Sequence, residues 1–201
     1  METDEEENLR IVNLKEDPAA GWIEDTISDF SATEASEIGA QFSPDGKWLA
    51  YVTNERGRFH EVFVCPSSSD LRGGIQKRRQ VSSPGISAIN PRWSGVDSPA
   101  LTFSGIGTGR GEYQIYIVPR IDEGTLGHES PAKWNGGVYY YLPKMAGYDL
   151  HPSGEKILVR KLAESLDEEE AEQTTSRVVL FENFLDYLRE EVPGTKGVLS
   201  K

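Results

Sequence analysis

Short runs of hydrophobic and polar positions between residues 38 and 66 predict three β-strands. The first run ends at Phe42. The second covers Trp48 to Thr53, and the third covers Glu61 to Cys65 and stops at Pro66. The second and third runs mix aromatic with β-branched residues, a composition typical of buried strands. The segment is therefore expected to fold as strand, turn, strand, loop, strand.

A four-residue turn is predicted between the first two of these strands, with the sequence Ser43-Pro44-Asp45-Gly46. Pro44 presets φ to about −65° at the second turn position. Asp45 supplies a side-chain acceptor for backbone N–H groups, and Gly46 is free to adopt a positive φ. These four residues are structural candidates, because each has a conformational reason to stand where it does.

The three-strand unit recurs further along the chain. Gln41-Phe42-Ser43 aligns with Arg92-Trp93-Ser94, 51 residues later, so that aromatic matches aromatic and small matches small. At the same offset, Leu49 to Thr53 aligns with Ala100 to Ser104. The repeat indicates that one structural unit is used more than once. The first two strands of the two copies hold five aromatic residues, which we call the repeat aromatics: Phe42, Trp48, Tyr51, Trp93 and Phe103.

A third copy opens at Tyr148, with the turn His151-Pro152-Ser153-Gly154 in the place of the first copy's turn. Its third strand is predicted at Arg177 to Phe181. A partial copy precedes the first, with a third-strand pattern at Leu9 to Leu14 and a fourth-strand pattern at Ile23 to Phe30. Periods of about 40–50 residues with short strands are typical of β-propeller blades.

These repeats predict an all-β chain built from propeller blades of four antiparallel strands. About three blades are present, fewer than the four to eight that close a ring, so an incomplete propeller forming an open arc is expected. The predicted segments are an acidic start at 1–7, blades within 8–190, and a loose tail at 191–201. The blades are a partial one at 8–31 and further ones at 38–82, 86–135 and 145–190, the last interrupted by an acidic insertion at 164–176.

Charge and hydropathy exclude several classes of partner. The net charge of −12 argues against nucleic acid, because binding a phosphate backbone needs a basic face. No run of 18 apolar residues and no signal peptide occurs in the chain, so no direct membrane insertion is expected. The single Cys65 lies in an apolar strand and is expected to be a small buried hydrophobe.

No catalytic, metal-binding or cofactor-binding site is predicted. The chain has no Gly-x-Ser-x-Gly elbow and no kinase motif, and His60, His128 and His151 all fall at loops or turns. With one cysteine and scattered histidines, the sequence lacks the spacing of a zinc site. The basic run at residues 77–79 is open to two interpretations, an anion-binding patch or the charged protection of an edge strand.

The segment from Phe42 to Tyr51, followed by 54–58 and 61–64, resembles the WD40-like (TolB-like) six-bladed β-propeller repeat. It is most similar to the propeller that follows the kinase domain and membrane span of many bacterial serine/threonine protein kinases. Pro91-Arg92-Trp93-Ser94 and Tyr148 to Gly154 match two further steps of that pattern. His151 and Ser153 depart from the family's last turn. The same Ser-Pro-Asp-Gly turn also occurs in propellers that gate prolyl-oligopeptidase-like peptidases.

This resemblance implies a non-catalytic module that binds a protein or small-molecule ligand in a sensor or scaffold role. The alternative is an accessory propeller of a kinase or peptidase whose catalytic domain lies outside these residues. A bacterial origin, in a periplasmic or cytoplasmic setting, is what the family suggests. Self-association through open blade faces is a further expectation, since an incomplete ring leaves such faces uncovered.

We expect the acidic insertion at 164–176 to be dispensable for folding. It holds six acidic residues and one large apolar side chain, and the entropy of loop closure changes only with the logarithm of loop length. Replacing it with a short Gly-Ser linker should leave the melting temperature within about 3 °C, as measured by calorimetry. Loss of cooperative unfolding would show that the segment packs against the sheets.

Overall fold

The computed structural model describes the greater part of the chain, and its described residues form four antiparallel sheets. They are residues 8–31, 33–67, 75–95, 100–106, 112–118, 121, 130–134, 139–140, 147–151, 153, 156–162 and 176–181. The all-β expectation is confirmed. The predicted segments at 1–7 and 191–201, and the insertion up to residue 175, lie outside the described residues.

The first sheet is a four-stranded meander of β3 (Glu37–Phe42), β4 (Trp48–Thr53), β5 (Glu61–Pro66) and β6 (Arg79–Gln80). The three strands predicted between residues 38 and 66 are confirmed. β5 runs one residue further than expected, because Pro66 pairs with Trp48 at its end. Consecutive strands lie side by side, as in a propeller blade.

The second sheet repeats this order with β7 (Ala88–Ser94), β8 (Ala100–Ile106), β9 (Glu112–Val118) and β10 (Ala132–Lys133). β11 (Tyr139–Tyr140) also pairs with β9, further along the same edge. The fourth strand of this blade is therefore made of two short pieces.

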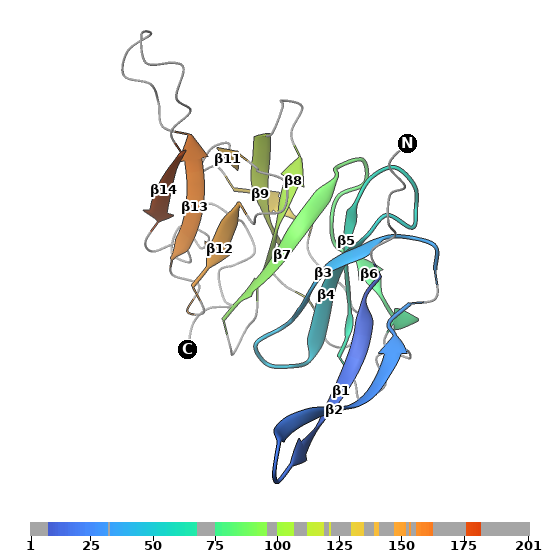
Figure 1. The fold of residues 1–201 in the computed structure, drawn as a ribbon. Coiled ribbons are helices and arrows are strands. Elements are labelled where there is room, and N and C mark those ends of the chain that lie inside the picture. The colour runs from blue at the N-terminus through green and yellow to red at the C-terminus, as the bar shows by residue number, and fades with distance from the viewer. Residues whose placement is uncertain are drawn as a thin grey trace, which may run out of the picture.

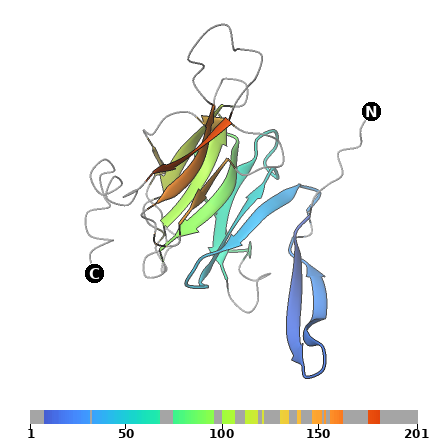
Figure 2. The same ribbon diagram turned by 60° about the vertical axis from the view of Figure 1, so that its left-hand side comes forward.

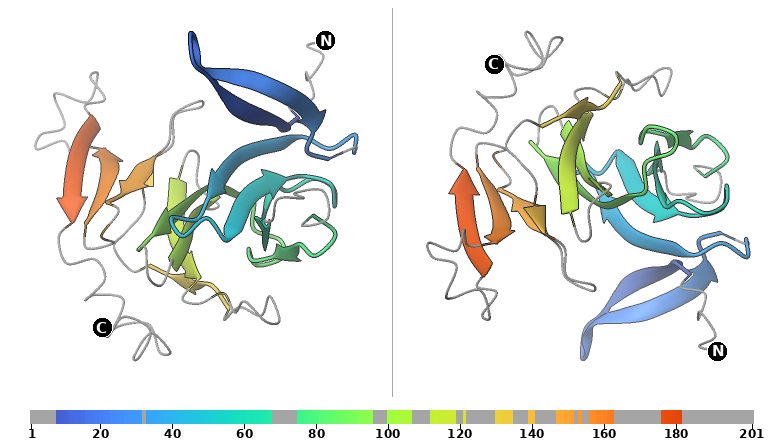
Figure 3. Two further views of the ribbon diagram at one scale, coloured as in Figure 1. Left: turned by 90° about the horizontal axis from the view of Figure 1, so that it is seen from below. Right: turned by 90° about the horizontal axis from the view of Figure 1, so that it is seen from above.

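The third sheet contains β12 (Tyr148–Leu150), β13 (Ile157–Leu162) and β14 (Ser176–Phe181). The three sheets fan around a common side, where the first strands β3, β7 and β12 approach one another (Figure 3). The described part of the fan does not close into a ring. The structure is thus an open arc of about three propeller blades.

The alternation of side chains along each strand builds two cores between neighbouring sheets. Ala50, Val52, Val62 and Val64 point from the first sheet toward the second, where Leu101 and Phe103 meet them. A second core lies between the second and third sheets and consists of Ile115, Ile117, Trp134, Tyr148, Leu150, Ile157 and Val159. Each sheet therefore depends on its neighbour for burial, as in other repeat folds.

The other face of the first sheet is also covered. Leu49, Tyr51, Phe63 and Cys65 pack with Phe30 in a third core, which Ile75, Leu9 and Ile11 complete. This face is therefore not one of the uncovered blade faces that an incomplete ring is expected to leave. On the third sheet, Leu158 is 44% exposed.

The chain's first two strands form an arm of their own. β1 (Arg10–Asp17) and β2 (Gly21–Asp29) pair as a hairpin that extends away from the other sheets (Figures 1 and 2). The two strands are confirmed, but among the described residues they pair with no other strand. We call residues 9–30 the N-terminal arm. Its base is fixed because Phe30 N donates to Leu9 O at 3.0 Å and Phe30 is buried in the third core.

Four of the five repeat aromatics lie in the cores, and one does not. Trp48, Trp93 and Phe103 lie between the first two sheets, and Tyr51 lies in the third core. Phe42 is 58% exposed although it aligns with Trp93. Trp93 is buried because it faces the preceding sheet, whereas the arm does not reach the corresponding position beside Phe42.

We expect Gly105→Ala to destabilise the second sheet. A Cβ at this position would lie 2.5 Å from Tyr116 Cε2 and 2.9 Å from Ile86 Cγ2, closer than packed carbon atoms tolerate. Overpacking of this kind costs about 1–3 kcal/mol of unfolding free energy. In a Tyr116→Leu background the ring is gone, so the same substitution should cost less. Equal costs in both backgrounds, measured by urea unfolding, would contradict this packing.

Candidate functional site

The predicted turn at residues 43–46 is held by its own side chains. Ser43 Oγ donates to Asp45 Oδ1 at 2.6 Å, and that carboxylate oxygen accepts Lys47 N at 3.1 Å. Ser43 Oγ also accepts Trp48 N at 2.9 Å. Gly46 has a φ of 70°, the left-handed conformation that glycine adopts without strain. Ser43 and Asp45 are therefore fully used in holding the turn.

The last turn uses a different side chain in the same way. His151 Nδ1 lies 2.8 Å from Ser153 Oγ and accepts Ser153 N at 3.2 Å. His151 N donates to Lys156 O at 3.0 Å, as Ser43 N does to Trp48 O. The proton of a neutral ring is then on Nε2, with Nδ1 as the acceptor. Pro152 and Gly154 lie outside the described residues.

Two hydrogen bonds join neighbouring sheets through their first strands. Trp93 Nε1 donates to Gln41 O at 3.1 Å, from the second sheet to the first. Tyr148 OH donates to Asn90 O at 2.9 Å, from the third sheet to the second, and lies 3.0 Å from Thr102 Oγ1. Burial raises the pKa of Tyr148 above its ordinary value, so the hydroxyl keeps its proton.

Both acceptor carbonyls lie at irregularities of the first strands. The register of β3 shifts between Ile38 and Gln41, and that of β7 shifts between Ile89 and Arg92. Gly39 in β3 and Asn90 in β7 have φ values of 64° and 53° and stand 51 residues apart, at equivalent places. A β-bulge leaves backbone groups outside the ladder, which makes them available to the next sheet.

A row of polar side chains crosses the inner strands of the three sheets. With the Gln41 amide oriented to satisfy both neighbours, its oxygen accepts Arg92 Nη1 at 2.8 Å and its nitrogen donates to Pro91 O at 3.1 Å. Arg92 Nε lies 3.6 Å from Asp149 Oδ1. The Arg92 side chain is 21% exposed, and that of Asp149 is 73% exposed. We call Gln41, Arg92 and Asp149 the inner polar row.

Sequence reasoning missed this row, although the repeat contained a signal for it. Gln41, Arg92 and Asp149 each stand two positions before the residue that begins or aligns with the turn, namely Ser43, Ser94 and His151. Equivalent positions of neighbouring blades lie next to one another around the inner side of the fold. Three polar residues at one repeat position therefore predict that their side chains meet. A comparison of residue types does not show this, because the three residues differ in type.

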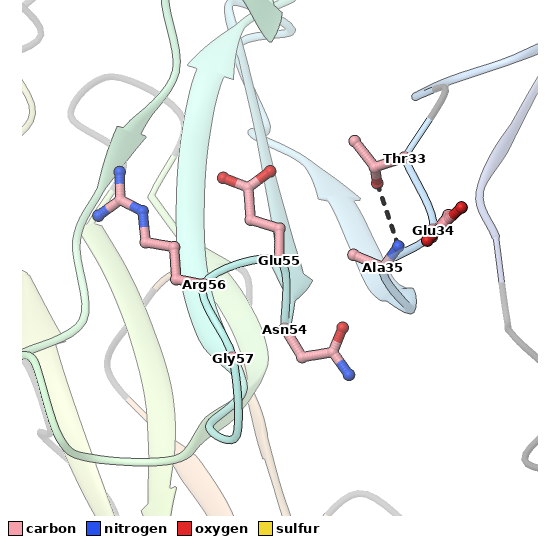
Figure 4. A pocket seen from close by; sticks show the side chains of 7 residues that line it. All are labelled: Thr33, Glu34, Ala35, Asn54, Glu55, Arg56 and Gly57. Atoms are coloured by element: carbon pink, nitrogen blue, oxygen red, sulfur yellow. Dashed lines mark hydrogen bonds between the residues drawn. The ribbon is translucent and has the colours of Figure 1, made fainter.

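A hollow lies beside the first sheet, between two loops. It has a volume of about 500 Å³, is open to solvent, and lies between residues 33–35 and residues 54–57 (Figure 4). The two walls are joined because Ser36 N donates to Asn54 Oδ1 at 2.9 Å. Within the first wall, Ala35 N donates to Thr33 Oγ1 at 3.4 Å. The buried Glu37 accepts Thr33 Oγ1 through one carboxylate oxygen, while its Oε2 has no partner.

The basic run at 77–79 divides in the structure. Arg78 Nη2 donates to both carboxylate oxygens of Glu55, at 2.8 and 2.7 Å, and its guanidinium lies 5.8 Å from the Phe63 ring centre. Lys77 and Arg79 are exposed. Because Glu55 neutralises Arg78, a patch made of all three cations is not what the fold presents.

The remaining candidate chemistry is not poised for reaction. Cys65 is buried, and burial raises the pKa of its thiol to about 12, although nearby Arg78 lowers it. The thiolate is therefore scarce at neutral pH. In the part of the chain that the structure describes, no three His, Cys, Asp or Glu side chains gather closely enough to hold a metal ion. Across these residues, no helix has the length and hydrophobicity to cross a membrane.

Comparisons with known proteins leave the chain without an assigned family. No family model matches it, and no curated protein matches it. Among solved structures it is similar to the crystal structure of TolB from Acinetobacter baumannii, with a TM-score of 0.40 and 16% sequence identity. The match covers 87% of this chain and 50% of the TolB chain, so this chain spans about half the length of that structure.

We expect Tyr148→Phe to destabilise the contact between the second and third sheets. Without the hydroxyl, Asn90 O loses a buried donor, and an unsatisfied buried group costs about 1–3 kcal/mol. Tyr116→Phe is the matched control, since its hydroxyl makes no hydrogen bond to the residues that the structure describes. The control should stay within about 0.5 kcal/mol of the parent in urea unfolding. Similar losses in both variants would contradict the role given to the Tyr148 hydroxyl.

Proposed function

We propose that the chain is a non-catalytic binding module whose ligand-contacting surface includes the inner polar row. The observation that carries this proposal is that Gln41, Arg92 and Asp149 stand at equivalent repeat positions and form one continuous line across three sheets. Side chains on rigid strands hold their geometry better than side chains on loops. A ligand that lies along the inner side of the arc would meet all three sheets at once.

The absence of catalysis is part of the proposal. The side chains that a hydrolytic enzyme would use have other tasks here, since Ser43 and His151 hold turns and Cys65 is buried with a raised pKa. A nucleophile needs a base within hydrogen-bond reach and an open approach for substrate. The described residues support binding better than turnover.

The row favours a ligand with hydrogen-bond donors. Asp149 is its most exposed member, and its 3.6 Å contact with Arg92 leaves the carboxylate able to accept further bonds. Arg92 is mostly covered, so it orients Asp149 more than it offers a site of its own. With a net charge of −12, the chain should prefer a cationic or neutral ligand, such as a basic peptide segment or an amine, over a nucleic acid.

A finer form of the proposal follows from the family resemblance. The match of Phe42 to Tyr51 and of Pro91 to Ser94 supports a propeller that accompanies a bacterial serine/threonine kinase or a prolyl-oligopeptidase-like peptidase. The coding sequence on both sides of these residues tests it. A kinase domain upstream or a hydrolase domain downstream would support an accessory role. If neither domain is encoded there, the chain is an independent binding module.

The binding surface can be tested with a panel of amines and basic dipeptides, using nuclear magnetic resonance to follow backbone amides. Ligands of the inner polar row are those that change the amide chemical shifts of β3, β7 and β12. We expect the Asp149→Asn variant to bind these ligands about tenfold more weakly than the parent, because it lacks the exposed charge. Glu34→Gln, at the hollow beside the first sheet, is the matched control and should bind as the parent does.

Two results would contradict this function. Ligands that bind elsewhere, with affinity unchanged by Asp149→Asn, would remove the inner polar row from the binding surface. Turnover of a peptide or phosphoryl substrate by the purified chain, abolished by one substitution in it, would show that the module is an enzyme.

A further inference from the structure

One face of the N-terminal arm is apolar and exposed. Opposite residues of an antiparallel pair lie on the same face, so Val12 and Ile27 share a face with Leu14 and Trp22. Their exposed fractions are 46, 47, 60 and 71%. The other face is mixed: it carries an Asn13–Thr26 hydrogen bond and a Lys15–Asp25 ion pair beside the half-buried Ile11 and Ile23. An isolated two-stranded hairpin is marginally stable in water, and this one gains stability if its apolar face is covered.

The rim of this face is acidic. Glu16 lies opposite Trp22, and Glu24 lies opposite Leu14, which places both carboxylates among the exposed apolar side chains. Neither has an ion-pair partner among the residues that the structure describes, whereas Asp29 pairs with Arg10 at 3.4 Å. A partner for this face should therefore combine apolar with cationic groups.

The outer edge of the first sheet has this combination. Arg58, Lys77 and Arg79 are exposed and have no ion-pair partner within the described part of the chain, although the protein as a whole is strongly acidic. Phe59 lies next to Arg58 and is 45% exposed. Arg56 adds a fourth cation, whose Nη1 donates to the neutral Gln80 at 2.8 Å and whose guanidinium lies 5.1 Å from the Phe63 ring centre.

The loop after β4 leans on the edge strand, which brings Arg56 beside β6. The Arg56–Gln80 hydrogen bond ties residues 54–60 to β6, and β6 pairs only with β5 in the described sheet. An edge strand presents unpaired backbone groups as well as side chains. We call Arg56, Arg58, Phe59, Lys77 and Arg79 the basic edge.

We propose that the N-terminal arm of one copy docks on the basic edge of a second copy of this chain. Glu16 and Glu24 pair with cations of that edge, and Trp22 lies against Phe59 or a guanidinium, a contact that both stacking and cation–π attraction favour. The same contact gives the exposed Arg58, Lys77 and Arg79 a role on an otherwise acidic chain. It also covers the face that the arm leaves open.

Other surfaces fit the arm less well. The apolar face of each arm carries one cation and three carboxylates. Two arms that faced each other would therefore repel, because each face has an excess of negative charge. The open face of the third sheet offers Leu158 as its exposed large apolar residue in the described part, and Asp149 beside it is acidic. Because arm and edge are different surfaces, the contact is head-to-tail and produces either a reciprocal pair or a longer chain.

Charge reversal on each surface tests this contact. Self-association is measured by sedimentation velocity at low salt, at protein concentrations from about 1 to about 100 µM, the range in which weak dimers dissociate. Glu16→Lys with Glu24→Lys reverses the arm, and Arg58→Glu with Arg79→Glu reverses the edge. Each double variant alone should weaken self-association about tenfold or more, since like charges then meet. A one-to-one mixture of the two double variants should associate again, because each surface then finds its opposite.

The control variant carries Glu34→Lys and Lys133→Glu, which lie outside both surfaces, and should associate as the parent does. Trp22→Ser should weaken association without changing net charge.

A parent chain that stays monomeric at every concentration would overturn the proposal. So would association that survives either reversal, or a mixture that fails to associate, since these results assign the contact to arms or sheet faces. Binding of the edge to anionic lipid vesicles, unchanged by arm reversal and without self-association, would assign the cations to a membrane surface.

Discussion

The fold depends on the way each sheet completes its burial against the next one. Val52 and Val64 of the first sheet are buried because Phe103 and Leu101 of the second sheet cover them. Polar bonds also join the stacked sheets, among them those from the Trp93 indole to Gln41 O and from the Tyr148 hydroxyl to Asn90 O. Apolar packing supplies most of the stability, whereas these bonds fix which strand lies opposite which.

Much of this architecture could be predicted because it is local. Alternation and β-branched residues located the strands, and Pro44 with Gly46 located the turn, since each effect acts within a few residues. The separate position of the N-terminal arm was not predictable in this way. Its strand pattern matched the outer half of a blade, but whether such a hairpin joins a sheet depends on the strands that lie beside it, and Phe30 is fixed to the first sheet instead.

The candidate site was harder to predict than the fold. Gln41, Arg92 and Asp149 differ in type, and they meet because they occupy one repeat position in three sheets, which is a property of the stacking. Arg78 shows the same limit, since its neighbours in sequence suggested a cationic patch and its neighbour in space, Glu55, neutralises it. Side-chain chemistry here is decided by contacts over long sequence separations.

The exchange of indole N–H protons is the most direct test of the stacked arrangement. Nuclear magnetic resonance resolves one indole N–H signal for each of the four tryptophans, Trp22, Trp48, Trp93 and Trp134. The Trp93 N–H donates across the sheets to Gln41 O and is predicted to exchange slowly with solvent, whereas that of Trp22, 71% exposed on the arm, is predicted to exchange at once. A Trp93 indole that exchanges as fast as that of Trp22 in the folded chain would contradict the stacking of the first two sheets.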